Sequence, residues 1–207
     1  MSILNAFVTP DLALIGVDTE ARLPDGATYQ VCKLVTVPHL GAAAGFRGLD
    51  VLQMFAASAI ISFKGDFDAL AETMPGLLTE AERFCRDQFG ASGDALAFNV
   101  VLVGYSESAG CMVGHAFDRT ADSEEIKIAS GLPNFIAPDV EADQLRSLHI
   151  VADKPGMSIL ARHQCQLIRD HDPGMAAGGR FFIAEVRRNS IHVEQAFEFP
   201  PRPEKVG

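Results

Sequence analysis

Four residues in the first quarter of the chain could cooperate in cleaving a covalent bond. Ser2 supplies a hydroxyl, Asp18 a carboxylate, Lys33 an ammonium group and Gly45 a backbone amide without a side chain over it. A serine hydroxyl is a weak nucleophile unless a base lies within hydrogen-bond reach. Lys33 stands inside an apolar run, where a lysine is rarely buried without a partner. The four residues therefore form a candidate site if folding brings them together.

These residues fall in order on the first four expected strands, and the pattern resembles the proteasome-type branch of the N-terminal-nucleophile hydrolases. It looks most like the bacterial members that act as the peptidase partner of an ATP-driven unfoldase, and their uncharacterised relatives. In that branch a mature N-terminal Thr, Ser or Cys begins the first strand, an Asp ends the second, a Lys starts the third and a Gly follows the fourth. Ser2 to Asp18 has the spacing of the branch, and Ser2 to Lys33 is one residue shorter.

The resemblance continues further along the chain. The segment Ile128–Gly131, which contains Ser130, resembles the Gly-Ser-Gly loop of the branch. Asp170, followed by a glycine-rich connection and a last hairpin, resembles its C-terminal third. The likeness in order extends over residues 2–199. In two places the chain departs from the pattern: Ile3 replaces a frequent second Thr, and no Ser follows shortly after Asp170.

The resemblance implies a hydrolase of peptide or amide bonds whose nucleophile is Ser2 after removal of Met1. A free α-amine has a pKa of about 7.7–8.0, so the amine of Ser2 can take the hydroxyl proton near neutral pH. Lys33 would lower the pKa of that amine, and Asp18 would hold Lys33. The amide of Gly45 would donate to the oxyanion in acyl transfer. By resemblance, two further residues would support the amine: Ser130 and Asp170.

The resemblance also implies self-assembly into a homo-oligomer through the outer helices, a peptide or protein substrate, a candidate unfoldase partner and no cofactor. A catalytically inactive assembly subunit of the same fold is the alternative, because fold does not settle function. In that case Asp18 and Lys33 form a structural ion pair, and Gly45 only permits close packing. A retained Met1 favours the subunit, and a free amine on Ser2 favours the enzyme.

The elements that must position these residues are expected to be strands and helices in mixed order. Four short strands come first, the third over residues 29–37, and they suggest one antiparallel sheet. Apolar residues then repeat with a helical period over 49–63 and 67–89. Asp66 can cap the second helix, and Pro75 should kink or divide it. The remaining expected elements are a hairpin of 99–105 with 111–117, a short strand at 125–129, a helix at 157–169, and a hairpin of 181–186 with 191–199.

This order predicts an α+β fold, a four-layer α-β-β-α sandwich in which two antiparallel sheets pack face to face with helices outside. The length of 207 residues and the hydrophobic content of 48% suit one well-packed unit. We expect a single domain over residues 1–199 and a flexible C-terminal tail over residues 200–207.

Composition argues against several classes of protein. A net charge of −10 disfavours a nucleic-acid-binding protein. No apolar run approaches the ~18 residues that span a bilayer, and the N-terminus lacks the pattern of a signal peptide, so we expect no membrane partner. The four cysteines are widely spaced, with no close Cys/His pair of zinc-ligand spacing. They are typical of a reducing compartment, so we expect a cytoplasmic protein without a metal.

Three other motifs are weaker. His163, Asp170 and their acidic or histidine neighbours at 171–172 do not make a convincing metal cluster. Residues 104–108 begin like a G-x-S motif but lack the closing glycine. Residues 174–179 do not follow a strand and open a helix, so they are not a phosphate loop.

Overall fold

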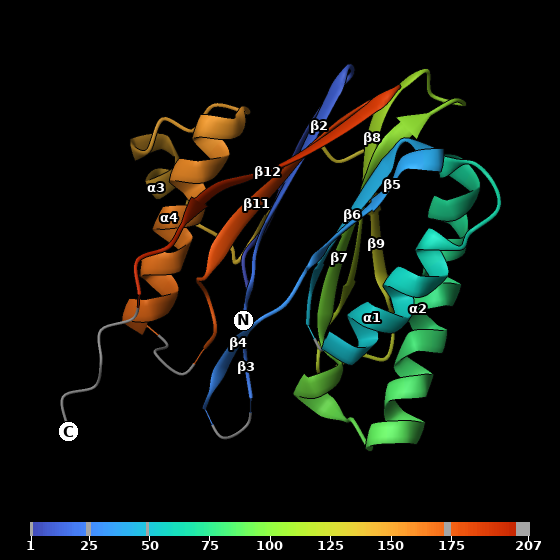
Figure 1. Cartoon of the computed structure of the whole chain (residues 1–207), viewed down its shortest axis with the longest axis horizontal. Coiled ribbons are helices and arrows are strands. Elements are labelled where there is room, and N and C mark those ends of the chain that lie inside the picture. The colour runs from blue at the N-terminus through green and yellow to red at the C-terminus, as the bar shows by residue number, and fades with distance from the viewer. Residues whose placement is uncertain (1, 24–25, 49, 172–174, 202–207) are drawn as a thin grey trace.

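The computed structural model describes residues 2–23, 26–48, 50–171 and 175–201. Two expectations fall outside these residues: the removal of Met1, and the part of the predicted tail at 202–207. The described residues form an α+β arrangement of strands, four α-helices and two short 3-10 helices, η1 (Pro38–Leu40) and η2 (Gly93–Leu96). Figure 1 shows these elements in chain order.

The first sheet has five antiparallel strands in the order β10-β1-β2-β11-β12. Its strands are β1 (Leu4–Thr9), β2 (Leu12–Asp18), β10 (Asn134–Ala137), β11 (Arg180–Arg187) and β12 (Ser190–Glu198). The helices α3 (Ala142–Ser147) and α4 (Lys154–His171) lie on its outer side (Figure 1). Buried side chains of α4, among them Met157 and Leu160, pack with Leu14 and Phe181 of this sheet. The apolar face of α4 is therefore covered by the first sheet.

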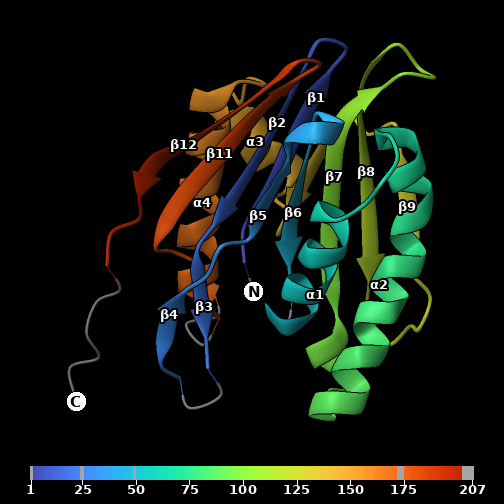
Figure 2. The ribbon, with the colours of Figure 1, turned by 45° about the vertical axis from the view of Figure 1, so that its right-hand side comes forward.

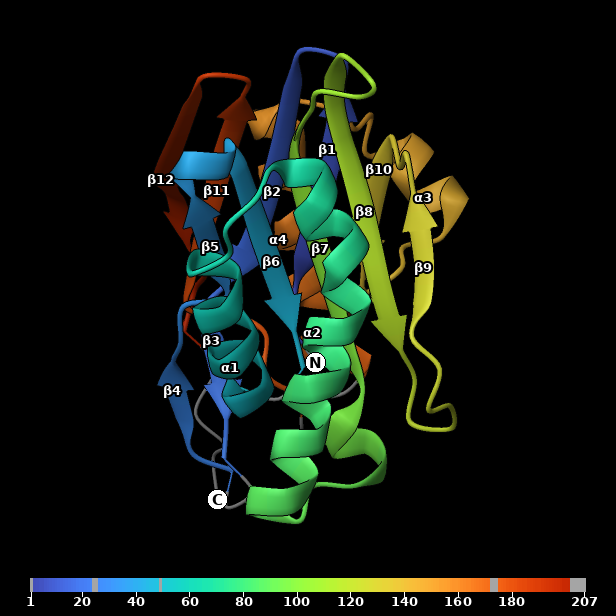
Figure 3. The same cartoon turned by 90° about the vertical axis from the view of Figure 1, so that its right-hand side faces the viewer.

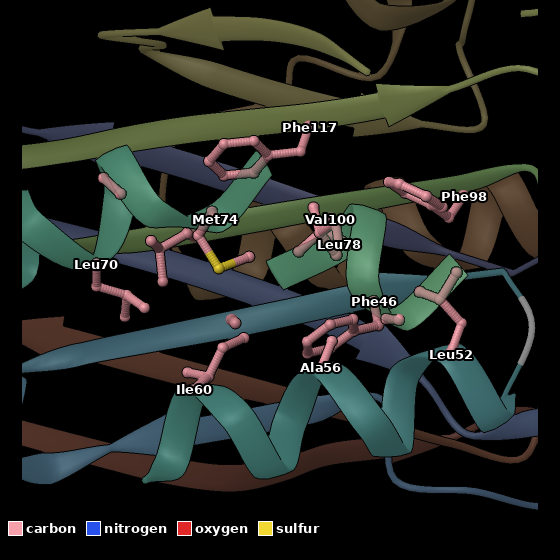
Figure 4. Packing of buried hydrophobic residues seen from close by; sticks show 14 of the residues in the cluster. Phe46, Leu52, Ala56, Ile60, Leu70, Met74, Leu78, Phe98, Val100 and Phe117 are labelled. Atoms are coloured by element: carbon pink, nitrogen blue, oxygen red, sulfur yellow. The ribbon is translucent and has the colours of Figure 1, made fainter. Parts of the chain in front are cut away.

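The second sheet also has five antiparallel strands, in the order β5-β6-β7-β8-β9. Its strands are β5 (Leu34–Val37), β6 (Ala42–Arg47), β7 (Phe98–Ser106), β8 (Cys111–Arg119) and β9 (Lys127–Ser130). The helices α1 (Asp50–Ile61) and α2 (Phe67–Phe89) cover its outer face (Figure 3). Figure 4 shows Ile60 of α1 and Met74 of α2 turned toward Phe46 and Phe117 of the sheet.

The two five-stranded sheets bury a third apolar cluster between them. Leu4 and Ile15 of the first sheet pack there with Ala43 and Val101 of the second. Figure 2 shows the strands of the two sheets face to face. Because these inner side chains come from both sheets, the packing of one sheet on the other decides how residues at their ends meet.

The prediction that the fold is a four-layer sandwich of two antiparallel sheets alone is wrong, because a third sheet is present. The described residues form three antiparallel sheets of five, two and five strands in a mixed α+β fold. The two-stranded sheet pairs β3 (Glu20–Arg22) with β4 (Thr28–Gln30). The side chains of β4 are exposed, whereas Glu20 and Ala21 of β3 are buried.

The single strand expected over residues 29–37 is also wrong, because it divides into β4 and β5 with Lys33 between them. The Lys33 side chain reaches Asp18 and the carbonyl oxygen of Glu20, and these polar contacts outweigh the strand preference of the segment. The expectation that the first four strands form one sheet fails as well. β1 and β2 belong to the first sheet, whereas β5 and β6 belong to the second.

Several expected elements are confirmed. The three predicted helices appear as α1, α2 and α4, and both predicted hairpins are present as β7–β8 and β11–β12. Asp66 caps α2 by accepting a hydrogen bond of 2.8 Å from the amide of Ala69. Pro75 does not divide α2, which continues to Phe89. Within the described part of the chain, no helix is both long and apolar enough to cross a membrane.

Candidate functional site

Ser2, Asp18 and Lys33 meet at one end of the two large sheets. Ser2 precedes β1, Asp18 ends β2, and Lys33 precedes β5. Lys33 Nζ donates hydrogen bonds to Ser2 Oγ at 2.9 Å, to Asp18 Oδ1 at 2.9 Å and to the Glu20 carbonyl oxygen at 2.5 Å. An ammonium group has three N–H donors, and these contacts use all of them. The exposed fractions of Ser2, Asp18 and Lys33 are 8%, 0% and 3%.

The carboxylate of Asp18 is held from both sides. Besides Lys33 Nζ, Asp18 Oδ1 accepts a hydrogen bond of 2.9 Å from the amide of Ile3. Asp18 Oδ2 accepts one of 3.1 Å from the amide of Gly178. Gly178 has φ +152, and a Cβ there would lie 2.8 Å from Arg169 Nη2. Only glycine fits this close approach, and it allows the loop before β11 to donate a hydrogen bond to the buried carboxylate of Asp18.

Ser2 also lines a cavity of about 720 Å³, together with Arg47, Gly48, Arg119 and Met175. Arg47 Nε donates a hydrogen bond of 2.9 Å to the carbonyl oxygen of Ser2. Burial lowers the pKa of the Arg47 guanidinium, and more distant carboxylates, first among them Asp18, oppose that effect. The Arg47 side chain therefore lines the cavity and also holds the peptide group between Ser2 and Ile3 in place.

Gly45 lies in the middle of β6, opposite Leu34 of β5 and Val101 of β7. A Cβ at this position would lie 2.5 Å from Leu4 Cδ1 and 2.8 Å from Ile15 Cδ1. The absence of a side chain thus lets the two sheets approach closely. The part of Gly45 in oxyanion binding stays a prediction.

Gly48 is a residue that the sequence analysis missed. It stands just after β6 and just before α1, with φ +141, and it lines the cavity beside Ser2. A Cβ at Gly48 would lie 2.8 Å from the carbonyl oxygen of Ala97. The available signal was its place at a strand-to-helix junction, where backbone amides near a helix start can face a ligand.

Ser130 and Asp170 do not join this cluster. Ser130 ends β9 at the edge of the second sheet, where its Oγ lies 3.0 Å from His115 Nδ1. Asp170 lies in the last turn of α4, and its Oδ1 accepts a hydrogen bond of 2.8 Å from Gln166 Nε2. Both side chains are exposed, and neither is among the residues that line the cavity beside Ser2. Their support of the Ser2 amine stays a prediction.

Arg47, Gly178 and Met175 were also missed as neighbours of the site. Arg47 ends β6, and a basic residue at a strand end gives no signal by itself. The glycine-rich stretch containing Gly178 was visible, but its partner Asp18 is 160 residues away. Among the described residues, no group of three or more His, Cys, Asp or Glu side chains is placed to hold a metal ion.

The sequence and the fold of the chain were compared with those of known proteins. No protein-family model and no curated protein matches the sequence. Solved structures match the fold, among them an Anbu (Gly-1) mutant from Hyphomicrobium sp. strain MC1, with a TM-score of 0.63 and 12% identity over 95% of this chain and 88% of that one. Anbu from Yersinia bercovieri, described as an ancestral beta-subunit, has a TM-score of 0.63 and 11% identity over 96% of this chain and 87% of its own. At 11–12% identity, these matches show that the fold of this chain is similar to that of the two Anbu structures.

Proposed function

We propose that the chain is a proteasome-like N-terminal-nucleophile hydrolase that cleaves peptide or amide bonds, with Ser2 as nucleophile once Met1 has been removed. The observation that carries this proposal is the buried contact of 2.9 Å between Lys33 Nζ and Ser2 Oγ. A buried lysine that points at a serine hydroxyl stabilises the alkoxide that forms during attack. The cavity next to Ser2 provides room for the substrate.

The hydrogen bonds of Lys33 indicate where the base must come from. A charged Lys33 has no lone pair with which to accept the serine proton, and its three N–H donors are all engaged in hydrogen bonds. The base is then the α-amine that Ser2 gains when Met1 is removed, because this amine belongs to the same residue as the hydroxyl. The positive charge of Lys33 would lower the pKa of that amine and so favour its free-base form.

The alternative is an inactive assembly subunit of the same fold. The position of Ser130 and Asp170 away from Ser2 favours it, because the amine then lacks the two polar supports that the resemblance implies. In that case the buried Lys33–Asp18 pair serves to join the two large sheets.

In either case we infer a homo-oligomer, because a matched structure is described as a beta-subunit. An unfoldase partner and a protein substrate belong to the same proposal. The four cysteines are free thiols. They support a reducing compartment, and hence a cytoplasmic location.

The first experiment determines the intact mass of the protein expressed without an N-terminal tag. Loss of Met1, followed by peptide hydrolysis that Ser2→Ala abolishes, is the expected result. Ser58→Ala, which alters an exposed serine of α1, is the matched control and keeps its activity. Retention of Met1 in essentially all molecules, with no peptide hydrolysis, would exclude the hydrolase and leave the subunit, whereas normal turnover by Ser2→Ala would exclude Ser2 as the nucleophile.

A further inference from the structure

The cavity beside Ser2 is basic in an acidic protein. Its only charged lining residues among those described are Arg47 and Arg119. The chain has 27 acidic and 17 Lys or Arg residues, so a cavity lined at random would more often carry carboxylates. Two guanidinium groups and no carboxylate at the edge of a serine site provide a place for an anion.

Arg47 has no acidic partner within ion-pair distance in the described part of the chain. Its Nε donates to the carbonyl oxygen of Ser2, and its Nη1 donates at 2.5 Å to Asn99 Oδ1. Both acceptors are neutral. Asn99 in turn donates at 2.7 Å to Asp118 Oδ1, so the hydrogen bonds connect Arg47 to a carboxylate only through the side-chain amide of Asn99. A mostly buried guanidinium without a counter-ion is costly, and a bound anion would offset that cost.

Arg119 is buried and only partly satisfied. Its Nε lies 2.9 Å from Glu82 Oε2, but the N–H is not aligned with that oxygen and has no hydrogen-bond acceptor. Glu82 also accepts a hydrogen bond of 2.6 Å from Arg86 Nη2. One carboxylate is therefore shared between two guanidinium groups, and Arg119 has capacity for a second anionic partner.

We propose that this cavity is a substrate subsite that binds a carboxylate close to the scissile amide through Arg47 and Arg119. A guanidinium group binds a carboxylate with two parallel hydrogen bonds, and these are stronger in a partly buried site than in water. The carboxylate has two sources in peptides, an acidic side chain or a free C-terminus. This inference rests on the proposed hydrolase function and names its substrate class.

A binding measurement tests the subsite without turnover. The Ser2→Ala protein is titrated with N-acetyl-glutamate N-methylamide, with N-acetylglycine, and with the neutral N-acetyl-glutamine N-methylamide. We expect one of the carboxylates to bind about tenfold more tightly than the neutral ligand, which corresponds to about 1.4 kcal/mol. Tighter binding of the first indicates an acidic side chain, and of the second a free C-terminus. Equal dissociation constants for all three ligands would overturn the proposal.

Substitutions locate the site. In the Ser2→Ala background, Arg119→Gln removes the carboxylate preference, whereas Arg188→Gln keeps it. Arg188 is a matched control because it also pairs with a glutamate, Glu107, but lines a different cavity. A preference that survives Arg119→Gln would overturn the assignment to this cavity. If Arg119→Gln fails to fold, the comparison of acid and amide in the parent protein still decides the proposal.

Turnover separates this inference from the hydrolase proposal. Wild-type protein is incubated with peptides that differ only in Glu or Gln before the scissile bond, or in a C-terminal acid or amide. A KM about tenfold lower for the acid, with similar kcat, supports the subsite. Hydrolysis without any acid preference refutes the subsite but keeps the hydrolase. Carboxylate binding without hydrolysis of any peptide refutes the hydrolase and keeps only a carboxylate-binding site at Arg47 and Arg119.

Discussion

Lys33 Nζ lies 2.9 Å from Ser2 Oγ, although the two residues lead into strands of different sheets. Ser2 enters the first sheet through β1, and Lys33 enters the second through β5. Their contact therefore depends on how closely the sheets pack. Leu4 and Ile15, which fill the inter-sheet core above Gly45, are part of what sets that spacing.

Removing the lysine tests whether the buried charges depend on each other. Lys33→Met leaves the carboxylate of Asp18 buried without its counter-ion, and we expect a loss of about 3–5 kcal/mol in the free energy of unfolding. The double variant Asp18→Asn/Lys33→Met should recover a large part of that loss but show no hydrolysis. Urea unfolding gives the free energies. If the single variant is as stable as the wild type, the two charges are not coupled.

Gly45 and Gly76 form a matched pair for a test of packing. Gly45→Ala places a methyl group 2.5 Å from Leu4 Cδ1, and overpacking of this kind costs about 1–3 kcal/mol. Gly76 lies on α2 with no atom within 4 Å of an added Cβ. Gly76→Ala should raise stability by about 0.5–1 kcal/mol, because alanine favours a helix interior. Thermal unfolding of both variants measures the contrast, and a neutral Gly45→Ala would contradict the close packing.

Arg47→Lys tests whether the Ser2 peptide group needs a fixed position. The guanidinium contacts the Ser2 carbonyl oxygen and Asn99 Oδ1 with two nitrogens, and one ammonium group cannot reproduce that planar fork. We expect kcat to fall about 10- to 100-fold, because small misplacement of a reacting group is costly. Arg187→Lys, an exposed change on β11, is the control. An unchanged kcat for Arg47→Lys would show that the contact does not position Ser2.

His115 should make stability depend on pH. Burial lowers the pKa of its imidazole, and the nearby charge of Asp68 opposes this only in part. A pKa that is lower in the folded state than in the unfolded state means that protonation favours unfolding. Its stabilising contribution is therefore complete above about pH 6.5 and is lost as the pH falls below that value. His115→Gln should flatten the pH dependence of urea unfolding between about pH 7.5 and 5.5.

The exposed histidine His192 on β12 provides the control for that experiment. His192→Gln should leave the pH dependence close to that of the wild type. If His115→Gln and His192→Gln have the same pH dependence as each other, the slope does not come from the half-buried imidazole of His115.

The inner part of the site was predictable from the sequence. A lysine in an apolar run must find an acidic partner, and Asp18 at a strand end was the available one. The wider site was not. α4 extends through Asp170 to His171, so the carboxylate is presented to solvent near a helix end instead of in a loop. No local pattern revealed that Gly178 returns to Asp18, since that contact joins segments 160 residues apart.

Pro75 shows a similar limit within one element. A proline in a helix interior removes a hydrogen bond and costs about 3 kcal/mol, so a break was a reasonable expectation. Leu70, Met74 and Leu78 on either side of it are fully buried against the second sheet. That packing holds α2 in one piece, and it depends on strands that lie elsewhere in the chain.

The contact between Gly178 and Asp18 has a consequence for the timing of synthesis. Ser2 leaves the ribosome long before Gly178, so the hydrogen bond from the Gly178 amide to the carboxylate of Asp18 cannot form until residue 178 has emerged. Domains complete their long-range pairings only when the distant segment is available. In a nascent chain Ser2 therefore lacks its finished surroundings, and it acquires them only when the segment before the last hairpin folds.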